Sequence, residues 1–307
     1  MQEFLFILSH IMLPIIIIVS IGYILQIQLA LDRMTLTKVM VNYIIPGFVF
    51  MTLYQADMDF NLLLYILLVL FLFSVVSFIV AQILSKLFGV KKEHSAMFTN
   101  AHLFYNAGNY GVPVNDLAFR GDPFAMSIQI MLVFYQNLIA YSYGVFALSA
   151  ERVGKGKALL GYFKMPIFYG LLFGFIFNYF QIPLPEGVTS ALSYIQKSMI
   201  GFVLFILGAQ IAGIHFKNVR KTAIIASFSK LILIPSVGFL LLLLFRIDGV
   251  VAEVILITIA MPSSVNSSVI ASHYSNDSEY AAEIVMISTL FSAFTIPLVI
   301  YVATTIF

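Results

Sequence analysis

The stretch NAGNYGVP, residues 106 to 113, interrupts a chain that is otherwise strongly apolar. It contains two asparagines, two glycines and a proline, with long apolar stretches on both sides. Proline lacks a backbone N–H and glycine lacks a Cβ, so this composition weakens an α-helix. In lipid, non-helical backbone is tolerated only where protein or a water-filled cavity surrounds it. The stretch therefore predicts a broken membrane helix.

The composition around this stretch is that of a membrane protein. Of 307 residues, 61% are hydrophobic and 10% are charged, whereas a soluble domain carries about 25% charged residues. The mean hydropathy is +1.02. The chain contains no Cys, which excludes disulfides, thiolate metal sites and cysteine nucleophiles.

Apolar stretches long enough to span a bilayer recur along the whole chain. A membrane-spanning helix needs about 20 apolar residues, and the loops between the candidates are short. We expect an all-α membrane protein with ten transmembrane helices, at residues 4–26, 35–54, 61–86, 94–117, 123–149, 164–183, 187–212, 222–245, 250–273 and 280–305.

The basic residues predict the orientation of these spans. Twelve of the sixteen lie in odd-numbered loops: Arg33, Lys38, Lys86, Lys91, Lys92, Arg152, Lys155, Lys157, Lys164, Lys217, Arg220 and Lys221. Even-numbered loops carry Arg120 and Arg246 and are otherwise acidic. Because cytoplasmic loops are enriched in Lys and Arg, odd loops are expected in the cytoplasm and both termini outside.

A weak internal repeat relates the two halves of the chain. The first span reads PIIIIVSIGYI from Pro14, and the sixth reads PIFYGLLFGFI from Pro166. Each half has five spans, an odd number, so the second half must be inverted relative to the first. Inverted repeats of this kind build secondary transporters, whose substrate site lies at the repeat interface near the midplane.

A second interruption lies at the corresponding place of the second half. The segment AMPSSVNSSVIA, residues 260 to 271, contains Pro262, four serines and Asn266. Each interruption falls in the fourth of five spans, and such a pair is the best sequence pointer to a binding site. The alternative is a pair of proline kinks patched by Asn and Ser without ligand contact.

These motifs resemble those of the auxin efflux carrier family, over essentially the full length of the chain. NAGNYGVPV resembles the family's N-x-G-x-x-G-x-P signature, and the segment from residue 260 onward resembles its last two spans; VNYIIPGFVF and LFILGAQIAG also fit. The bacterial branch of this family includes malate and malonate permeases. The resemblance implies a five-plus-five inverted repeat in which helices four and nine unwind and cross at their prolines, an architecture shared with bile acid sodium symporters.

The resemblance also implies a domain organisation. We expect a first five-helix repeat at 1–149, a cytoplasmic connecting loop at 150–163 and a second, inverted repeat at 164–307. Spans 1, 2, 6 and 7 are expected to form a scaffold that dimerises, and spans 3–5 and 8–10 a mobile transport domain. Plant members have a long loop in mid-chain, which is short here, so regulation through that loop and auxin as the substrate do not carry over.

The crossing is the expected substrate site. Two half-helix N-termini aim their positive ends at the midplane, which suits an anion. Neutral donors for the substrate are expected from Asn106, Asn109, Ser263, Ser264, Asn266 and Ser267. The crossover backbone is assigned to Gly108, Gly111, Pro113 and Pro262. The resemblance points most directly to Asn106, which aligns with the crossover asparagine of the plant carriers.

Three charged residues within the spans are candidates for coupling or gating, because charges are costly there. Asp116 is a proton carrier or simply the external end of the broken helix. Lys197 is a gate for anions or a lysine that snorkels to the interface. Glu283 couples protons or partners a Lys at the interface.

Other polar residues within the spans have simpler expected roles. Lys230 is expected to snorkel towards the interface, and His102 to be packed and hydrogen-bonded. The amides Asn42, Gln136, Asn137 and Gln210 are expected to hold helices together.

Together these features predict a secondary active or facilitative transporter. It is expected to move a small organic anion, a carboxylate, across the cytoplasmic membrane by elevator-type alternating access. Proton coupling or uncoupled movement is favoured over sodium symport, because the ninth-span break contains no acid. The alternative is a channel or sensor that uses the same pocket. The expected partners are the anion, the lipid bilayer and a second copy of the chain, with no nucleic acid.

An enzyme is not expected. The five His are scattered and no HExxH zinc motif occurs, so we expect no metal site. The connection at residues 151–164 resembles a phosphate-binding loop, but Tyr162 stands where the phosphate-binding Lys is needed. We therefore expect no nucleotide and no other cofactor.

Overall fold

The computed structural model describes residues 2–56, 60–144, 147–148, 166–212, 219–265, 267–268, 271 and 278–307. The connecting loop expected at 150–163 lies outside these residues. Within these residues, six helices are long and apolar enough to cross a membrane: Phe4–Leu29, Arg33–Tyr54, Asn61–Leu87, Glu186–Ala212, Lys221–Leu244 and Glu279–Ile306. Shorter apolar helices cover Pro123–Ile139, Pro166–Tyr179 and Gly249–Ile259. The predicted all-α, multi-pass membrane fold is confirmed.

The helices of the first half follow the predicted spans closely. They are α1 (Gln2–Phe6), α2 (Leu13–Leu29), α3 (Arg33–Val39), α4 (Ile45–Tyr54), α5 (Phe60–Leu87), α6 (Lys92–Leu103), α7 (Val112–Ala118) and α8 (Pro123–Ile139). Those of the second half are α11 (Pro166–Tyr179), α12 (Glu186–Ala212), α13 (Lys221–Phe228), α14 (Ile234–Leu244), α15 (Gly249–Ile259) and α17 (Ser278–Ile306).

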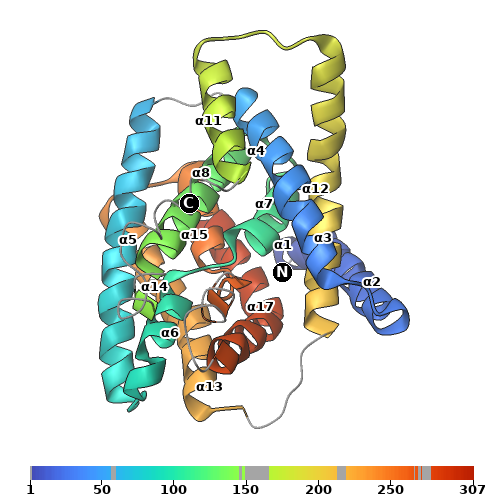
Figure 1. Cartoon of the computed structure of the whole chain (residues 1–307). Coiled ribbons are helices and arrows are strands. Elements are labelled where there is room, and N and C mark those ends of the chain that lie inside the picture. Colours follow the sequence, from blue (N-terminus) through green and yellow to red (C-terminus); the bar gives the residue numbers. More distant parts are fainter. Residues whose placement is uncertain are drawn as a thin grey trace.

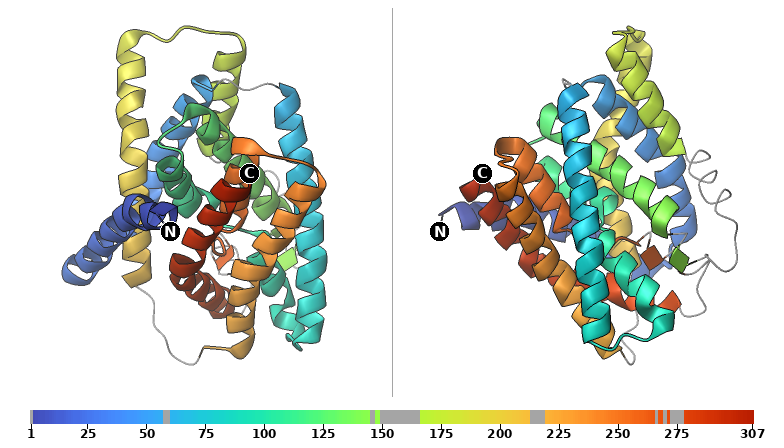
Figure 2. Two further views of the ribbon diagram at one scale, coloured as in Figure 1. Left: turned by 180° about the vertical axis from the view of Figure 1, so that it is seen from behind. Right: turned by 90° about the vertical axis from the view of Figure 1, so that its left-hand side faces the viewer.

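Corresponding spans of the two halves run in opposite directions. In Figure 1, α5 descends, whereas its counterpart in the second half, the pair α13 and α14, ascends. Likewise α3 and α4 ascend and their counterpart α12 descends. Figure 2 shows the two ends of the chain on the same side of the molecule, where the rings of Phe4 and Tyr301 meet edge-on with centroids 6.2 Å apart.

Several spans widen locally into π-helical turns. Among the described residues these are η1 (Ile7–Met12), η2 (Met40–Ile44), η3 (Ala107–Gly111), η4 (Ala140–Gly144) and η5 (Ser229–Leu233). A proline follows the last residue of four of them by two positions: Pro14, Pro46, Pro113 and Pro235. The proline ring clashes with the carbonyl four residues earlier and cannot bond to it. A widened turn is one of the known ways in which a helix accommodates such a defect.

One group of helices, from spans 1, 2, 6 and 7, packs through glycine. α2 lies against α12, and α4 lies against α11 and α12. A Cβ on Gly22 would overlap the carbonyl oxygen of Phe205, and one on Gly208 would overlap that of Val19. The backbones of α2 and α12 therefore approach so closely that no other residue fits at these two positions.

A second group contains the helices of the remaining spans. α5 packs on α6 and α14, α13 packs on α17, and α15 packs on α8 and α17. The two groups meet where α4 contacts α8, where α12 contacts η3 and α7, and where η1 of the first span contacts α7 and α17. Both interrupted spans therefore belong to the second group, and the first interruption faces the first group.

Candidate functional site

The two interrupted spans break where the sequence predicted. α6 ends at Leu103, Phe104 is extended with φ −102° and ψ 116°, and helical structure resumes at Ala107. In the second half α15 ends at Ile259, and non-helical backbone follows at 261–264. The fourth and ninth spans are therefore broken helices.

The two breaks supply hydrogen-bond partners for each other's backbone groups. The Asn106 N–H donates to the Pro262 carbonyl at 2.8 Å, and the Ser264 N–H donates to the Phe104 carbonyl at 2.9 Å. These bonds form an antiparallel bridge between Tyr105 and Ser263. Unpaired backbone groups are costly in the membrane interior. The crossing thus supplies the hydrogen bonds that each helix loses at its interruption.

Side chains from three helices satisfy further groups at the first break. Gln129 of α8 donates from Nε2 to the Ala107 carbonyl at 2.8 Å. Asn115 of α7 donates from Nδ2 to the Gly111 carbonyl at 3.1 Å, and its Nδ2 also lies 2.9 Å from Gln129 Oε1 and 3.0 Å from Thr258 Oγ1 of α15. The network joins both interrupted spans to α8.

Glycine at position 111 leaves room for this network. A Cβ on Gly111 would lie 2.9 Å from Gln129 Nε2, the atom that donates to the Ala107 carbonyl. A larger residue would therefore displace the amide that supports the break. At Gly108, by contrast, an added Cβ would have no atom within 4 Å, so this glycine borders open space.

A cavity of about 760 Å³ adjoins the first break. It is bounded by η3, α8 and Ser264 on one side, and by α3, η2, α4, α11 and α12 on the other. It reaches the turn between α2 and α3, where Leu31, Asp32, Arg33 and Met34 line it. The cavity therefore lies between the two groups of helices and extends to one end of the molecule.

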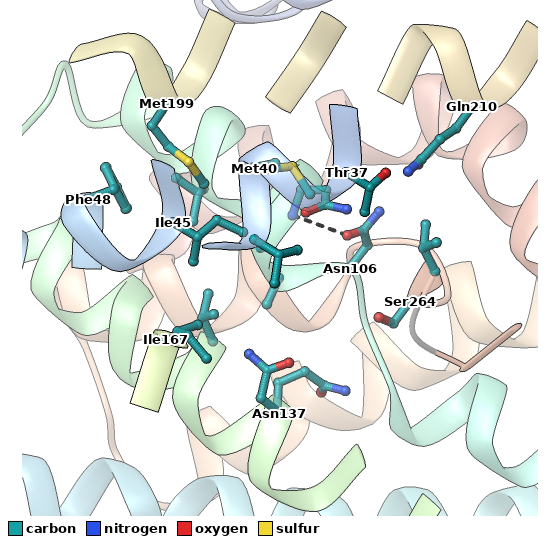
Figure 3. Close-up of a pocket in the computed structure, with 18 of the residues that line it drawn as sticks. Thr37, Met40, Ile45, Phe48, Asn106, Asn137, Ile167, Met199, Gln210 and Ser264 are labelled. Atoms are coloured by element: carbon teal, nitrogen blue, oxygen red, sulfur yellow. Dashed lines mark hydrogen bonds between the residues drawn. The ribbon is translucent and has the colours of Figure 1, made fainter. Parts of the chain in front are cut away.

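The cavity has a polar and an apolar side. Figure 3 shows Asn106, Thr37, Gln210 and Ser264 towards one side, and Phe48, Ile45, Ile167 and Met199 towards the other, where Asn137 adds one amide near Ile167. This distribution suits a ligand that has a polar group and an apolar body.

Asn106 is the central polar residue of this cavity. Its side chain is 3% exposed, and its Oδ1 accepts from the backbone N–H of Asn109 at 3.3 Å, the bond drawn in Figure 3. Since a backbone N–H only donates, this contact fixes the orientation of the amide. The Nδ2 group is buried without a hydrogen-bond partner among the described residues, so it is a donor held ready for a ligand or water.

Unpartnered polar atoms are concentrated around this cavity. Among the described residues, ten buried side-chain atoms lack a hydrogen-bond partner. Five of them belong to residues that line the cavity: Gln26 Oε1, Tyr105 Oη, Asn106 Nδ2, Gln136 Nε2 and Gln210 Oε1. Buried polar groups are normally satisfied, so their clustering marks a place where a polar ligand or water belongs.

Three amides of this cavity were expected only to hold helices together. Gln136, Asn137 and Gln210 line the cavity, whereas Asn42 is exposed and donates to the Lys38 carbonyl at 2.8 Å. A single amide in an apolar helix gives the same sequence signal in both situations. The sequence pattern therefore could not separate these residues from Asn42.

The end of the cavity at the α2–α3 turn carries one acidic and one basic residue. Asp32 caps α3: Thr35 Oγ1 donates to its Oδ2 at 2.6 Å and the Met34 N–H donates to its Oδ1 at 3.1 Å. These two bonds hold the pKa of Asp32 below its usual value. Arg33 makes no ion pair within the described residues. The Asp32 carboxylate thus accepts hydrogen bonds from the backbone and Thr35, while the Arg33 guanidinium is free to bind an anion.

The predicted substrate-binding residues divide into two sets. Asn106, Asn109 and Ser264 line the cavity, as does Gly108. Behind the wall, the Ser263 hydroxyl donates to the Ala101 carbonyl at 2.8 Å and the Ser267 hydroxyl to the Ser264 carbonyl at 2.6 Å. The crossover residues Gly111, Pro113 and Pro262 are buried at the breaks and do not line the cavity. Asn266 lies outside the described residues.

The three coupling or gating candidates all lie away from the cavity. Asp116 is half-buried on α7. Lys197 is on the exposed face of α12. Glu283 of α17 is paired with Arg220, whose Nη1 lies 2.7 Å from Glu283 Oε1 and whose N–H donates to Oε2 at 3.1 Å. Any role of these residues in transport would therefore act at a distance from the ligand.

In the part of the site that the structure describes, acidic and metal-ligating residues do not cluster. Within the described ranges, no group of three or more His, Cys, Asp or Glu residues is placed to hold a metal ion. At the crossing, the chemistry that the cavity offers is hydrogen bonding by neutral amides and hydroxyls beside an apolar wall, while Asp32 and Arg33 supply charges at its other end.

Apolar membrane spans, two of them broken and crossing beside a polar cavity, define a membrane transporter. The chain belongs to the membrane transport protein family, whose model matches residues 7–300; the resemblance to the auxin efflux carrier family is thereby confirmed. It is 26% identical over 300 residues to an uncharacterised transporter of Methanothermobacter thermautotrophicus, covering 93% of this chain and 95% of that one. It is 27% identical over 306 residues to an uncharacterised transporter of Methanocaldococcus jannaschii, covering 94% and 96%.

Proposed function

We propose that this transporter moves a small organic anion across the cell membrane and binds its carboxylate at the crossing of the fourth and ninth spans. The observation that carries the proposal is the Asn106 amide. It is buried, it lines the cavity, and its Nδ2 donor has no partner among the described residues. A carboxylate accepts hydrogen bonds and donates none, so it complements this donor.

The surroundings of Asn106 favour a negative charge. Ala107, Gly108 and Asn109 line the cavity at the start of a helix that continues through η3 into α7. A helix N-terminus carries about half a positive charge. Gln136 Nε2 and Tyr105 Oη add unpartnered donors within the described part of the chain. These groups hold an anion without a full countercharge, and the moderate affinity that results suits a carrier that must release its substrate.

The opposite wall supports a substrate with an apolar body. Ile45, Phe48, Ile167 and Met199 contribute apolar surface to the cavity. A ligand that places its carboxylate at Asn106 would bury its remaining atoms against this wall. A dicarboxylate as small as malonate would leave much of a cavity of about 760 Å³ to water, so a larger monocarboxylate is the better fit.

The two groups of helices support alternating access by an elevator motion. The cavity lies between them, and the crossing belongs to the group formed by α5, α6, α8, α13, α14, α15 and α17. In the proposed cycle this group slides against the glycine-packed group of α2, α4, α11 and α12 and carries the crossing with it. We further propose that the protein forms a homodimer through the latter group.

A ligand screen followed by a flux assay tests the proposal. Thermal unfolding of the purified full chain is measured with monocarboxylates, dicarboxylates, indole acids, amino acids and bile acids. We expect at least one carboxylate to raise the unfolding temperature, because ligands stabilise the state that binds them. The stabilising compound should then show saturable counterflow in proteoliposomes. A conductance that does not saturate would indicate a channel, and binding without flux would indicate a sensor.

The proposed orientation places the α2–α3 turn in the cytoplasm and both termini outside. The chain has no Cys, so single cysteines can be introduced without removing native ones. Lys91 and Gln181 are both exposed, the first in an odd loop and the second in an even loop. In intact cells, a membrane-impermeant maleimide should label Gln181→Cys and should label Lys91→Cys only after the membrane is opened. The reverse pattern would invert the topology.

A further inference from the structure

A buried lysine joins the two broken helices. Lys230 lies in η5 of the eighth span and is 0% exposed. The sequence predicted a lysine that snorkels to the interface, and the structure instead encloses its whole side chain. Its Nζ lies 3.2 Å from the Ile259 carbonyl oxygen and 3.4 Å from that of His102. It also lies 5.3 Å from the centroid of the Tyr105 ring.

The two carbonyls that Lys230 contacts are equivalent parts of the two halves. Ile259 is the last residue of α15, and His102 is in the last turn of α6. Both helices end at the crossing. The last carbonyls of a helix have no partner within it and carry about half a negative charge. The ammonium therefore bonds to the negative ends of both interrupted helices.

Within the described residues, this ammonium has no charged partner. In the described part of the chain, no carboxylate lies within ion-pair distance of Lys230. The neighbouring His102 ring is engaged elsewhere: Nδ1 lies 2.8 Å from the Phe98 carbonyl oxygen, and Nε2 lies 2.6 Å from Ser229 Oγ. A buried charge must be compensated, and here helix ends provide the compensation.

We propose that Lys230 is a tethered cation, which neutralises the converging ends of α6 and α15 and occupies the place that a bound metal cation would otherwise fill. The crossing therefore needs no sodium ion, because a second cation near a buried ammonium would be repelled strongly at low dielectric. The transport consequence rests on the proposed function, whereas the effect on stability does not.

The same charge also reaches the substrate site through Tyr105. Tyr105 lines the cavity next to Asn106, and its ring contacts Lys230. Lys230 itself is not part of the cavity wall. It therefore attracts an anion into the cavity without forming an ion pair that would hold it there.

The test replaces the tethered cation by a free one. Lys230→Ala retains Cβ, so n-propylammonium supplies the four missing atoms. We expect Lys230→Ala to lower the unfolding temperature, because its hydrogen bonds to two helix ends are lost. We expect it also to reduce anion uptake by about 10-fold, the size expected for losing a nearby positive charge that does not touch the anion. n-Propylammonium should restore part of both. Neutral 1-propanol and tetramethylammonium, which has no N–H, should restore neither.

Three comparisons make the result decisive. Lys230→Met fills the space without charge, so it should lose as much stability and uptake as Lys230→Ala, and n-propylammonium should not restore them. Lys197→Ala, on the exposed face of α12, should have the stability of wild type and should respond to n-propylammonium as wild type does. Wild-type uptake should be equal in sodium and in N-methylglucamine buffers. A Lys230→Met protein as stable and as active as wild type would overturn the proposal, and so would sodium-dependent wild-type uptake. If neither Lys230 variant folds, the sodium comparison on the unmodified protein still tests the proposal, because sodium-dependent uptake would contradict it. If no anion is transported at all, the proposed function fails, and the stability and rescue measurements judge Lys230 alone.

Discussion

Replacing Gly208 by alanine is expected to destabilise the folded protein by at least about 3 kcal/mol, at the upper end of the range for overpacking a core. Replacing Gly201 by alanine in the same helix should have the opposite effect. Both residues lie within α12, Glu186–Ala212, so the two variants share the same helix and the same change of residue.

The physical reason is the distance between two backbones. A Cβ on Gly208 would overlap the Val19 carbonyl oxygen and would lie 2.9 Å from the Tyr23 nitrogen. These are main-chain atoms of α2, so relief requires the two helices to separate. At Gly201 no atom lies within 4 Å of an added Cβ. There alanine only reduces the conformational entropy of the unfolded chain, which stabilises by about 0.5–1 kcal/mol.

The difference in stability is measured by thermal unfolding of both variants in detergent, monitored through the loss of the helical circular dichroism signal. Gly201→Ala also controls for any effect of alanine on expression or detergent extraction. Equal unfolding temperatures for the two variants would mean that α2 and α12 do not approach as closely as described.

Replacing Asn106 by aspartate is expected to weaken binding of the organic anion by at least about a hundredfold while leaving the fold intact. The lost hydrogen bond to a charged group is worth about 1.5–3 kcal/mol, and the like charge placed beside the substrate adds a further penalty of several kcal/mol. Asn106→Ala, which removes the donor without adding charge, should lose about 10- to 100-fold.

The fold should survive because aspartate keeps the side-chain oxygen that accepts a hydrogen bond at this position. The Asn106 Oδ1 accepts from the Asn109 N–H, and aspartate is as good a cap for a helix N-terminus as asparagine. The protein should therefore still fold, although its unfolding temperature without ligand should fall because the buried carboxylate loses its hydration. Binding is measured by the ligand-induced rise in that temperature and by uptake.

Asn42→Asp is the matched control for this prediction. Asn42 is exposed and does not line the cavity, so the same change of charge there should leave anion binding unaltered. If the anion stabilised Asn106→Asp as well as it stabilises wild type, the substrate would bind elsewhere.

Much of the fold follows from the sequence because lipid permits few solutions. The apolar stretches located the described spans, and the concentration of Asn, Gly and Pro at residues 106–113 located the first break. The π-helical turns before Pro14, Pro46 and Pro235 were not predicted. A proline within a helix can be accommodated by a kink, a break or a widened turn, and neighbouring helices decide among these.

The site was less predictable than the fold. Asn106 and Asn109 stand at a break that forces them out of a regular helix, so their place in the cavity could be inferred. Gln136 and Gln210 lie in regular helices, and their orientation depends on packing between elements distant in sequence. Lys230 shows the same limit: its partners are carbonyls 128 and 29 residues away, and no local pattern reveals them.

The backbone bridge between Tyr105 and Ser263 has a consequence for how this chain can evolve. The Asn106 N–H depends on the Pro262 carbonyl, and the Ser264 N–H on that of Phe104. A mutation that straightened one helix would leave the other with buried, unpaired groups, each costing about 1–3 kcal/mol. The two interruptions must therefore be gained or lost together. Only scattered identities still relate the two halves of the chain. Because each break depends on the other, we expect both breaks to be retained together as the sequence changes.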